Sequence, residues 1–278
     1  MKAFNMKSLM INSLGAAVML AAILPAPAMS AEMVKLHAAG SLRGALTAVS
    51  AAFKRDTGIA VDMKFGASGL LKNAIAGGEK AEVFASANME HPRALHKDGR
   101  SVPVVLFARN QMCALVKPGL TVDTQNVLDR MLDPSVKLGS STPKNDPSGD
   151  YAWEIFEKAD ALKPGATATL KKKAMQLVGK ADSEKAPPGK SIYGVFITRG
   201  DVDMFLTYCT NGIAARKDNP GLQIVHLPEG LSVGADYGMT VMKDASGSAF
   251  RYALFIMSAD GQKILAENGF ISPALQQE

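Results

Sequence analysis

The sequence is poor in the residues that most often carry catalysis or hold metal ions. Among 278 residues there are two cysteines, four histidines and one tryptophan, and aromatic residues make up 6%. The histidines lack metal-binding spacing, because His91 and His96 lie five residues apart rather than three or four. Two cysteines give no support for a zinc site. We therefore expect neither a cation site nor a resident cofactor.

The chain also lacks a strong charge of either sign. It has 31 basic and 26 acidic residues, and residues 1–31 hold Lys2 and Lys7 but no acid. The rest therefore carries 29 basic against 26 acidic side chains, or +3, which is no footprint of a nucleic-acid-binding protein. Neither a phosphate-binding G-x-x-x-x-G-K-[ST] motif nor a G-x-S-x-G nucleophile elbow is present. Nucleic-acid partners are excluded, and no motif points to catalysis.

Apolar residues form a long run only at the N-terminus. Lys2 and Lys7 precede an apolar stretch from Leu9 to Leu24, which prolines close and small residues follow. This stretch is shorter than the ~20 residues of a membrane-spanning helix. The pattern is typical of a secretory signal peptide, so we expect residues 1–31 to be cleaved and the mature chain to reach the periplasm. In that oxidising compartment Cys113 and Cys209 could pair, but we favour two separate buried thiols.

Hydrophobic periodicity predicts strands that alternate with helices. The expected strands are 34–39, 59–65, 83–86, 106–116, 136–140, 203–208, 222–227 and 238–242. The expected helices are 42–55, 70–76, 91–97, 148–158, 165–179, 191–198 and 250–268. Such alternation indicates βαβ units with parallel strands, and therefore an α/β fold.

The pattern restarts after Val116, which predicts two doubly wound α/β lobes joined by a hinge of two crossings. Residues 32–110 and 235–278 would form the first lobe, and residues 111–234 the second. The crossing segments would be Leu106–Val116 and Leu227–Tyr237. Ligands of open α/β sheets bind beyond the carboxyl ends of the strands, so we expect the site in the cleft between the lobes.

Three expected strand-to-helix turns contain serine beside glycine: Gly40-Ser41, Ser68-Gly69 and Ser148-Gly149. Unpaired backbone N–H groups and the positive end of the helix dipole favour an anion at such turns. One such serine means little, because serine is a common helix cap. The set of three favours an anion site built from neutral donors.

The order of these motifs resembles that of the periplasmic molybdate-binding proteins of ABC importers, which have the type II periplasmic binding-protein fold. The resemblance spans nearly the whole chain after residue 31. The matching segments are Ala38–Leu42, Phe65–Leu70, Ala81–Ala87, Asp146–Ala152, Asp203–Tyr208 and Asn268–Phe270.

The resemblance implies a binding protein with no catalytic residues, which holds a tetrahedral dianion, molybdate or tungstate, without a counter-charge. By position, Ser41 and Ser68 would contribute side chain and amide, Ser148 its amide with its hydroxyl as a further candidate, and Tyr208 its phenol. These groups bind the oxygen atoms, so the metal atom of the ligand needs no cation site. The resemblance further implies a monomer that delivers its ligand to a membrane permease.

A further amide is implied at a helix start near Lys190, with Ser191 as the alternative. Here the sequence departs from the family, because Lys190 adds a positive charge near a site that normally lacks one. Gly69 stands at a commonly hydroxylated position, and Phe205 where glycine is common.

Other functions remain open at this point. The chain could be a receptor of the same fold for another oxyanion, for iron, or for an organic acid that Arg43 would face. A secreted hydrolase with Ser41 or Ser68 as nucleophile is the least favoured, because the sequence places no histidine or acid to activate either serine.

Overall fold

The structure is a computed structural model that describes Met1 and residues 33–273. The predicted signal peptide, residues 1–31, lies outside the described residues apart from Met1, and its cleavage stays a prediction. Between residues 33 and 273, no helix has both the length and the apolar character that crossing a bilayer requires.

Within the described residues, nine strands form one sheet with the order β2-β1-β3-β9-β4-β7-β5-β6, and β8 lies beside β4. The strands are β1 (Met33–Ala39), β2 (Ala60–Gly66), β3 (Val83–Ser86), β4 (Val105–Val116), β5 (Leu138–Ser141), β6 (Met175–Val178), β7 (Met204–Tyr208), β8 (Gln223–His226) and β9 (Gly234–Val241).

Ten α-helices and two short 3-10 turns connect these strands in the described part of the chain. They are η1 (Gly40–Leu42), α1 (Arg43–Thr57), α2 (Ser68–Ala76), α3 (Glu90–Lys97), α4 (Val127–Leu132), α5 (Pro147–Leu162), α6 (Ala166–Lys173), α7 (Ile192–Arg199), α8 (Cys209–Asp218), η2 (Glu229–Leu231), α9 (Gly247–Met257) and α10 (Ala259–Glu267).

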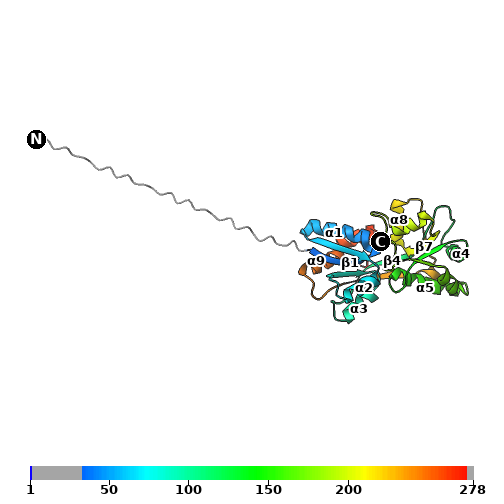
Figure 1. Cartoon of the computed structure of the whole chain (residues 1–278), viewed down its shortest axis with the longest axis horizontal. Coiled ribbons are helices and arrows are strands. Elements are labelled where there is room, and N and C mark those ends of the chain that lie inside the picture. The colour runs from blue at the N-terminus through cyan, green and yellow to red at the C-terminus, as the bar shows by residue number, and fades with distance from the viewer. Residues whose placement is uncertain (2–32, 274–278) are drawn as a thin grey trace. The chain divides into compact units, whose positions relative to one another are not determined.

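The long strand β4 belongs to both halves of the sheet. Its residues 105–111 pair with β9, and residues 112–116 pair with β7 and β8. Figure 1 shows β4 between two groups of elements, with α1, α2, α3 and α9 around β1, and α4, α5 and α8 near β7. We call these groups the first and second lobes. The predicted boundary at residues 110 and 111 falls beside the change of partner; that the lobes move as separate bodies stays a prediction.

The expected α/β architecture is confirmed. Strands β3, β5 and β7 are buried at every position, as expected for strands covered on both faces. In the first lobe, β1 and β2 pair in parallel with Ala39 opposite Gly66. In the second lobe, β5 and β7 pair in parallel with Gly139 opposite Phe205. The carboxyl ends of the strands in each pair therefore lie at one edge of the sheet.

Two expected helices are wrong in part. The helix predicted over 165–179 ends at Lys173, and Met175–Val178 instead forms the edge strand β6 against β5. The helix predicted over 250–268 is two helices, since Ser258 ends α9 and its hydroxyl accepts the Gly261 N–H to cap α10. Local periodicity reveals neither feature. Strand β6 depends on its pairing with β5, and the break between α9 and α10 depends on the cap that the Ser258 side chain forms.

The expectation of two separate thiols is wrong, because the structure contains a Cys113–Cys209 disulfide with its Cα atoms 5.0 Å apart. The antiparallel register of β4 and β7 sets Cys113 opposite Thr207, two residues before Cys209. This register is a long-range property that the two isolated cysteines do not reveal.

Candidate functional site

Four of the predicted ligand residues lie at carboxyl ends of strands. Ser41 and Ser68 each stand two residues beyond the paired positions Ala39 and Gly66 that end β1 and β2. Tyr208 is the last residue of β7, and Ser148 lies in the first turn of α5, which follows β5. The register of each parallel pair therefore brings these residues to the sheet edge where ligands of α/β folds bind.

In the first lobe, both serine hydroxyls already have partners. The Ser41 Oγ lies 2.9 Å from the Tyr237 Oη. The Ser68 Oγ accepts a hydrogen bond of 3.1 Å from the Ala87 N–H, and Ser68 is almost completely buried. Since a hydroxyl both donates and accepts, Ser68 keeps its own proton for a further acceptor. Neither serine hydroxyl is hydrogen bonded to a histidine or a carboxylate, the contact a nucleophilic serine needs.

In the second lobe, three hydroxyls are buried without a hydrogen-bond partner: Ser141 Oγ, Thr142 Oγ1 and Ser148 Oγ. The backbone at Ser141 and Thr142 packs against the start of α5, since a Cβ added at Gly149 would be 2.7 Å from the Ser141 carbonyl oxygen and 2.5 Å from the Thr142 carbonyl carbon. Unpartnered buried hydroxyls are uncommon and each costs about 1–3 kcal/mol. The end of β5, the residue after it and the start of α5 thus contain donors without a partner.

Phenols connect the two lobes. The rings of Tyr208 and Tyr237 lie 5.6 Å apart, and that of Tyr151 lies 6.2 Å from Tyr208. The Tyr208 Oη donates to the Ala87 carbonyl oxygen over 3.5 Å. Burial raises the pKa values of Tyr208, Tyr237 and Tyr193 well above 10, so these phenols keep their protons at neutral pH. They act as hydrogen-bond donors rather than as phenolates.

A direct backbone contact also joins the lobes. The Gly69 N–H in α2 donates to the Asn145 carbonyl oxygen over 2.8 Å. A Cβ at position 69 would lie 2.5 Å from the Lys144 carbonyl oxygen and 2.7 Å from that of Asn145. Only glycine fits this approach, which accounts for its presence where the family commonly has a hydroxyl. Lys144 is the one non-glycine residue with positive φ (68°) among the described residues.

Lys190, the fifth predicted ligand residue, contacts Pro187 and Asp218. Its side chain is exposed, with the Nζ 3.9 Å from an oxygen of Asp218, and its N–H donates to the Pro187 carbonyl. The alternative, Ser191, donates its N–H to Asp218 over 3.0 Å. Both predicted amides are therefore occupied, and the structure shows no positive charge from Lys190 at the site.

Sequence analysis missed Tyr237, Ser141, Thr142 and Asp146 as site residues. Tyr237 belongs to β9, which closes the first lobe from a distant part of the chain. Ser141 ends β5 and Thr142 follows it, and the position of a polar pair at a strand end was the available signal. Asp146 lies in a segment that carried the resemblance, but its role follows only from its contact with Ser148, described below.

Asp146 caps α5, because its Oδ1 accepts the Ser148 N–H over 3.1 Å. Burial raises the pKa of Asp146 to about 6, even though the Ser148 N–H and the nearby Ser141 hydroxyl act to lower it. The Ser141 hydroxyl lowers the pKa of Asp146 and of Tyr193, so it lies near both side chains, although neither contact has the geometry of a hydrogen bond. The site thus places the titratable carboxyl group of Asp146 among neutral donors.

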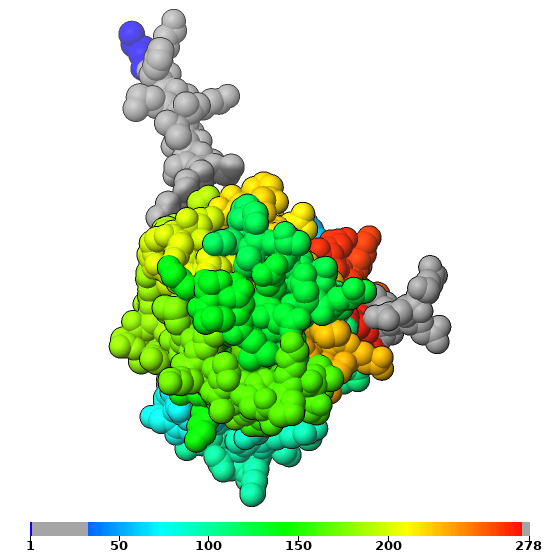
Figure 2. Space-filling view, turned by 90° about the vertical axis from the view of Figure 1, so that its right-hand side faces the viewer, coloured from blue at the N-terminus to red at the C-terminus, as the bar shows by residue number. Residues whose placement is uncertain are grey.

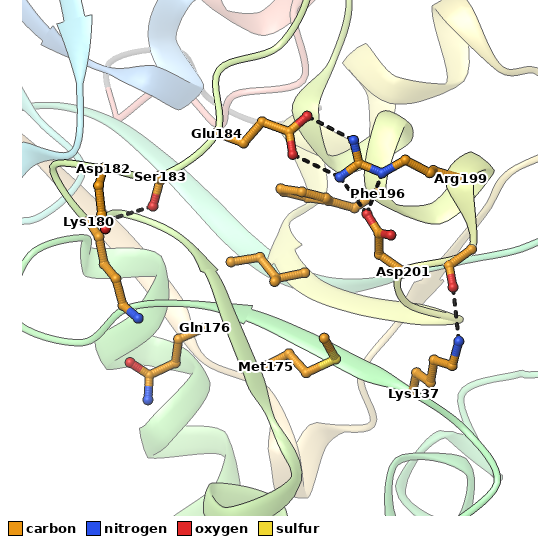
Figure 3. Close-up of a pocket in the computed structure, with 12 residues that line it drawn as sticks. Lys137, Met175, Gln176, Lys180, Asp182, Ser183, Glu184, Phe196, Arg199 and Asp201 are labelled. Atoms are coloured by element: carbon orange, nitrogen blue, oxygen red, sulfur yellow. Dashed lines mark hydrogen bonds and ion pairs between the residues drawn. The ribbon is translucent and has the colours of Figure 1, made fainter.

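Two hollows lie elsewhere in the described structure. The larger, of about 840 Å³, is lined by residues that include Lys137, Phe196 and Arg199. Figure 3 shows the Arg199 guanidinium held by both oxygens of Glu184 and by Asp201, so it has no free charge for an anion. The smaller hollow, of about 320 Å³, lies beside Cys209 and His226.

His226 also lies near the disulfide, and its Nδ1 is 3.6 Å from the Cys113 Sγ. These three residues are the one grouping of metal-type side chains in the described part of the chain. Because both sulfurs are bonded to each other, they are not available as thiolate ligands.

Residues 34–271 match the family described as bacterial extracellular solute-binding protein. The chain belongs to this family. Figure 2 looks onto the second lobe of this solute-binding protein, where the green and yellow segments that include α5 and α8 cover most of the visible face. The family description agrees with a protein that acts outside the cytoplasm and binds a solute.

Two curated relatives are similar in sequence to this chain along most of its length. An uncharacterized protein of Pasteurella multocida is 32% identical over 240 residues, which cover 86% of this chain and 98% of the relative. The molybdate-binding protein ModA of Mycobacterium tuberculosis is 24% identical over 267 residues, which cover 89% and 87%.

Two solved structures have a similar fold. The periplasmic molybdate-binding protein of Azotobacter vinelandii has a TM-score of 0.71 and 20% identity, with 88% of this chain and 100% of that chain covered. The sulfate-binding protein SubI of Mycobacterium tuberculosis has a TM-score of 0.70 and 19% identity, with 87% and 88% covered. At these identities the likeness shows the type II periplasmic binding-protein fold alone.

Proposed function

We propose that this solute-binding protein captures a tetrahedral oxyanion between its lobes, with molybdate and tungstate as the first candidates, and delivers it to the permease of an ABC importer. The observation that carries the proposal is the group of three unpartnered buried hydroxyls at Ser141, Thr142 and Ser148. An oxyanion that accepts their hydrogen bonds would remove the cost of leaving them unpaired.

The donors around this group suit an anion without a counter-charge. The hydrogen bonds of Ser41, Ser68, Ser148 and Tyr208 involve no lysine or arginine. A dianion that leaves water needs its lost hydrogen bonds replaced, since an uncompensated buried charge costs many kcal/mol. Hydrogen bonds to a charged acceptor contribute ~1.5–3 kcal/mol each, so several converging hydroxyls and amides supply the replacement.

The contacts between the lobes give a route from binding to delivery. Ser68 and Tyr208 come from different lobes, and both contact the backbone of Ala87. An oxyanion that both residues hold would favour the closed arrangement over an open one. A permease that recognises the closed arrangement would then distinguish the loaded from the empty receptor.

The alternatives have less support. An organic acid would need an arginine that faces it. The candidate, Arg43, is exposed, and its guanidinium lies 4.7 Å from the centre of the Phe65 ring. Iron receptors of this fold often use paired tyrosines, but the raised pKa values of Tyr208 and Tyr237 oppose phenolate ligands. Sulfate remains the competing oxyanion, since a sulfate-binding protein shares the fold.

Calorimetric titration of the exported chain with molybdate, tungstate, sulfate and phosphate tests the proposal. We expect one-to-one binding of molybdate and tungstate, weaker binding of sulfate and phosphate, and a melting temperature that rises with the tighter ligands. Sodium chloride at the same ionic strength is the control. Equal affinities for all four anions would remove the selectivity, and no binding of any of them would overturn the proposed function.

A further inference from the structure

A carboxylate of the chain itself already occupies the helix end that the oxyanion would use. The Asp146 Oδ1 accepts the Ser148 N–H over 3.1 Å, and this N–H is one of the donors that the resemblance assigns to the ligand. Asp146 therefore sits at the anion position of α5, next to the unpartnered hydroxyls of Ser141 and Ser148, both of which are completely buried.

The Asp146 side chain has little room to leave this position. A Cβ at Gly179, which follows β6, would lie 2.8 Å from the Asp146 Cβ and 3.6 Å from its Oδ2. Gly179 has a φ of 97°, a left-handed conformation that glycine adopts without strain. The turn after β6 thus lies directly against the Asp146 side chain, and we expect a bound oxyanion to meet the carboxyl group there.

The groups that face Asp146 supply no positive charge. Asp150 from α5 repels it, and the Ser148 N–H and the Ser141 hydroxyl stabilise its ionised form. The phenols of Tyr193 from α7, Tyr208 from β7 and Tyr237 from β9 respond to its charge. In the described residues, none of the groups that shift its pKa is a lysine or arginine, and Lys144 acts on Asp150 instead.

We propose that Asp146 links oxyanion capture to a proton, so that binding of one dianion takes up one proton, which is shared between the Asp146 carboxyl group and an oxygen of the guest. This inference rests on the proposed function and names a specificity device within the same site. No covalent bond of the protein breaks, because the proton comes from solvent and ends in a hydrogen bond between the two oxygen atoms.

The physical reason is charge repulsion at a half-buried carboxyl group. An ionised Asp146 carboxylate beside a dianion puts three negative charges among neutral donors. Adjacent like charges raise the pKa of the weaker acid. One proton removes the repulsion and replaces it with a hydrogen bond. The empty protein is prepared for this step, because burial already holds the pKa of Asp146 near 6.

The affinity for the oxyanion should depend on pH. Above about pH 6 the carboxyl group of the empty protein is ionised, so binding must take up a proton and affinity falls as pH rises, by up to tenfold per pH unit. Below about pH 6 the empty protein carries the proton already, and the affinity levels off.

Calorimetry in pairs of buffers that differ in protonation enthalpy measures this uptake. We expect molybdate binding to the wild-type chain to take up close to one proton at pH 8 and progressively less below pH 6. The dissociation constant should rise about tenfold from pH 7 to pH 8. Binding at pH 8 without proton uptake would overturn the role of Asp146 and leave the proposed function standing, whereas a wild-type chain that binds no oxyanion would overturn both.

Variants separate Asp146 from other groups. Asp146→Asn keeps a helix-capping side chain and should bind molybdate without proton uptake and with a nearly flat pH profile between pH 7 and pH 8. Asp146→Ser, a second capping variant, should behave in the same way. His91→Gln is the control, because His91 is a buried group whose pKa responds to Glu90 and Lys72 but not to Asp146. If Asp146→Asn keeps the proton uptake of the wild type, the inference is wrong.

Discussion

The N–H of Gly69 in the first lobe donates to the carbonyl oxygen of Asn145 in the second over 2.8 Å, so two helix N-termini meet through backbone atoms alone. Because a Cβ at position 69 would lie 2.5 Å from a carbonyl oxygen, Gly69→Ala should oppose the closed arrangement. The usual cost of overpacking, about 1–3 kcal/mol, should appear as weaker oxyanion binding in a calorimetric titration.

The control for this variant is Gly247→Ala in α9, where an added Cβ has no atom within 4 Å. It should leave the affinity unchanged. If Gly69→Ala bound as tightly as the wild type, the contact between α2 and the Lys144–Asn145 loop would not belong to the ligand-bound arrangement.

The serine hydroxyls of the first lobe should contribute directly to affinity. Ser41→Ala and Ser68→Ala should each weaken molybdate binding by about 1–3 kcal/mol, since each removes a donor to a charged acceptor. Ser50→Ala is a matched control, because Ser50 Oγ lies 2.7 Å from Tyr252 Oη in a serine–tyrosine pair like that of Ser41 and Tyr237, but in the core beneath α1. It should lower the melting temperature and spare the affinity. If Ser41→Ala did the same, Ser41 would not belong to the site.

Removal of the unpartnered hydroxyls should change affinity without lowering stability. Ser148→Ala and Ser141→Ala each remove a buried hydroxyl that lacks a partner in the empty protein. We expect the free energy of unfolding of the empty chain to stay the same or rise, while the affinity for molybdate falls. Urea denaturation and calorimetry measure the two quantities, and a loss of stability without a loss of affinity would make these hydroxyls structural.

Asp146 should also make the free energy of unfolding depend on pH. Its pKa is raised from 3.8 to about 6 in the folded chain, so folding binds extra protons between these values and stability falls as pH rises through that window. Asp146→Asn should therefore stabilise the empty protein at pH 8, by at most ~3 kcal/mol, and have a smaller effect at pH 4. Urea denaturation at the two pH values measures the difference, and an equal effect at both would contradict the raised pKa.

The disulfide should matter for stability more than its position at the edge of the site indicates. It closes a separation of 96 residues between Cys113 and Cys209, for which the chain-entropy model gives about 4–5 kcal/mol. We expect a reducing agent to lower the urea midpoint of the wild type by a corresponding amount. The double variant Cys113→Ala/Cys209→Ala should have the lower midpoint already and not respond to the reductant.

Sequence reasoning predicted the turns that depend on local pattern, while their role in binding stays a prediction. Ser41, Ser68 and Ser148 follow short strands and precede or begin helices, and such turns are readable from glycine, serine and apolar spacing. The parallel pairing of β1 with β2 then brings the first two serines together without any further information. The architecture is recognisable for the same reason, since strand and helix periods alternate along most of the chain.

What the sequence did not predict depends on contacts between distant segments. Tyr237 reaches Ser41 across 196 residues, and Cys113 reaches Cys209 through the register of two antiparallel strands. Lys190 was placed near the site by counting along the chain, but the turn at Pro187 directs its N–H elsewhere. Asp146 was visible as a residue of a motif, yet only its distance from the Ser148 N–H gives it a role.

Because β4 serves both lobes, Asn110 sits where any relative rotation of the lobes has to be absorbed. Its buried amide donates to Thr210 over 2.8 Å on one side and to the Tyr237 phenol over 3.2 Å on the other. Three residues further on, the disulfide ties the same strand to α8 and stiffens it. If the lobes rotate as predicted, this part of β4 would have to bend beside a side chain that bonds to both lobes. The amide proton resonances of Asn110 would then report the opening of the lobes in solution.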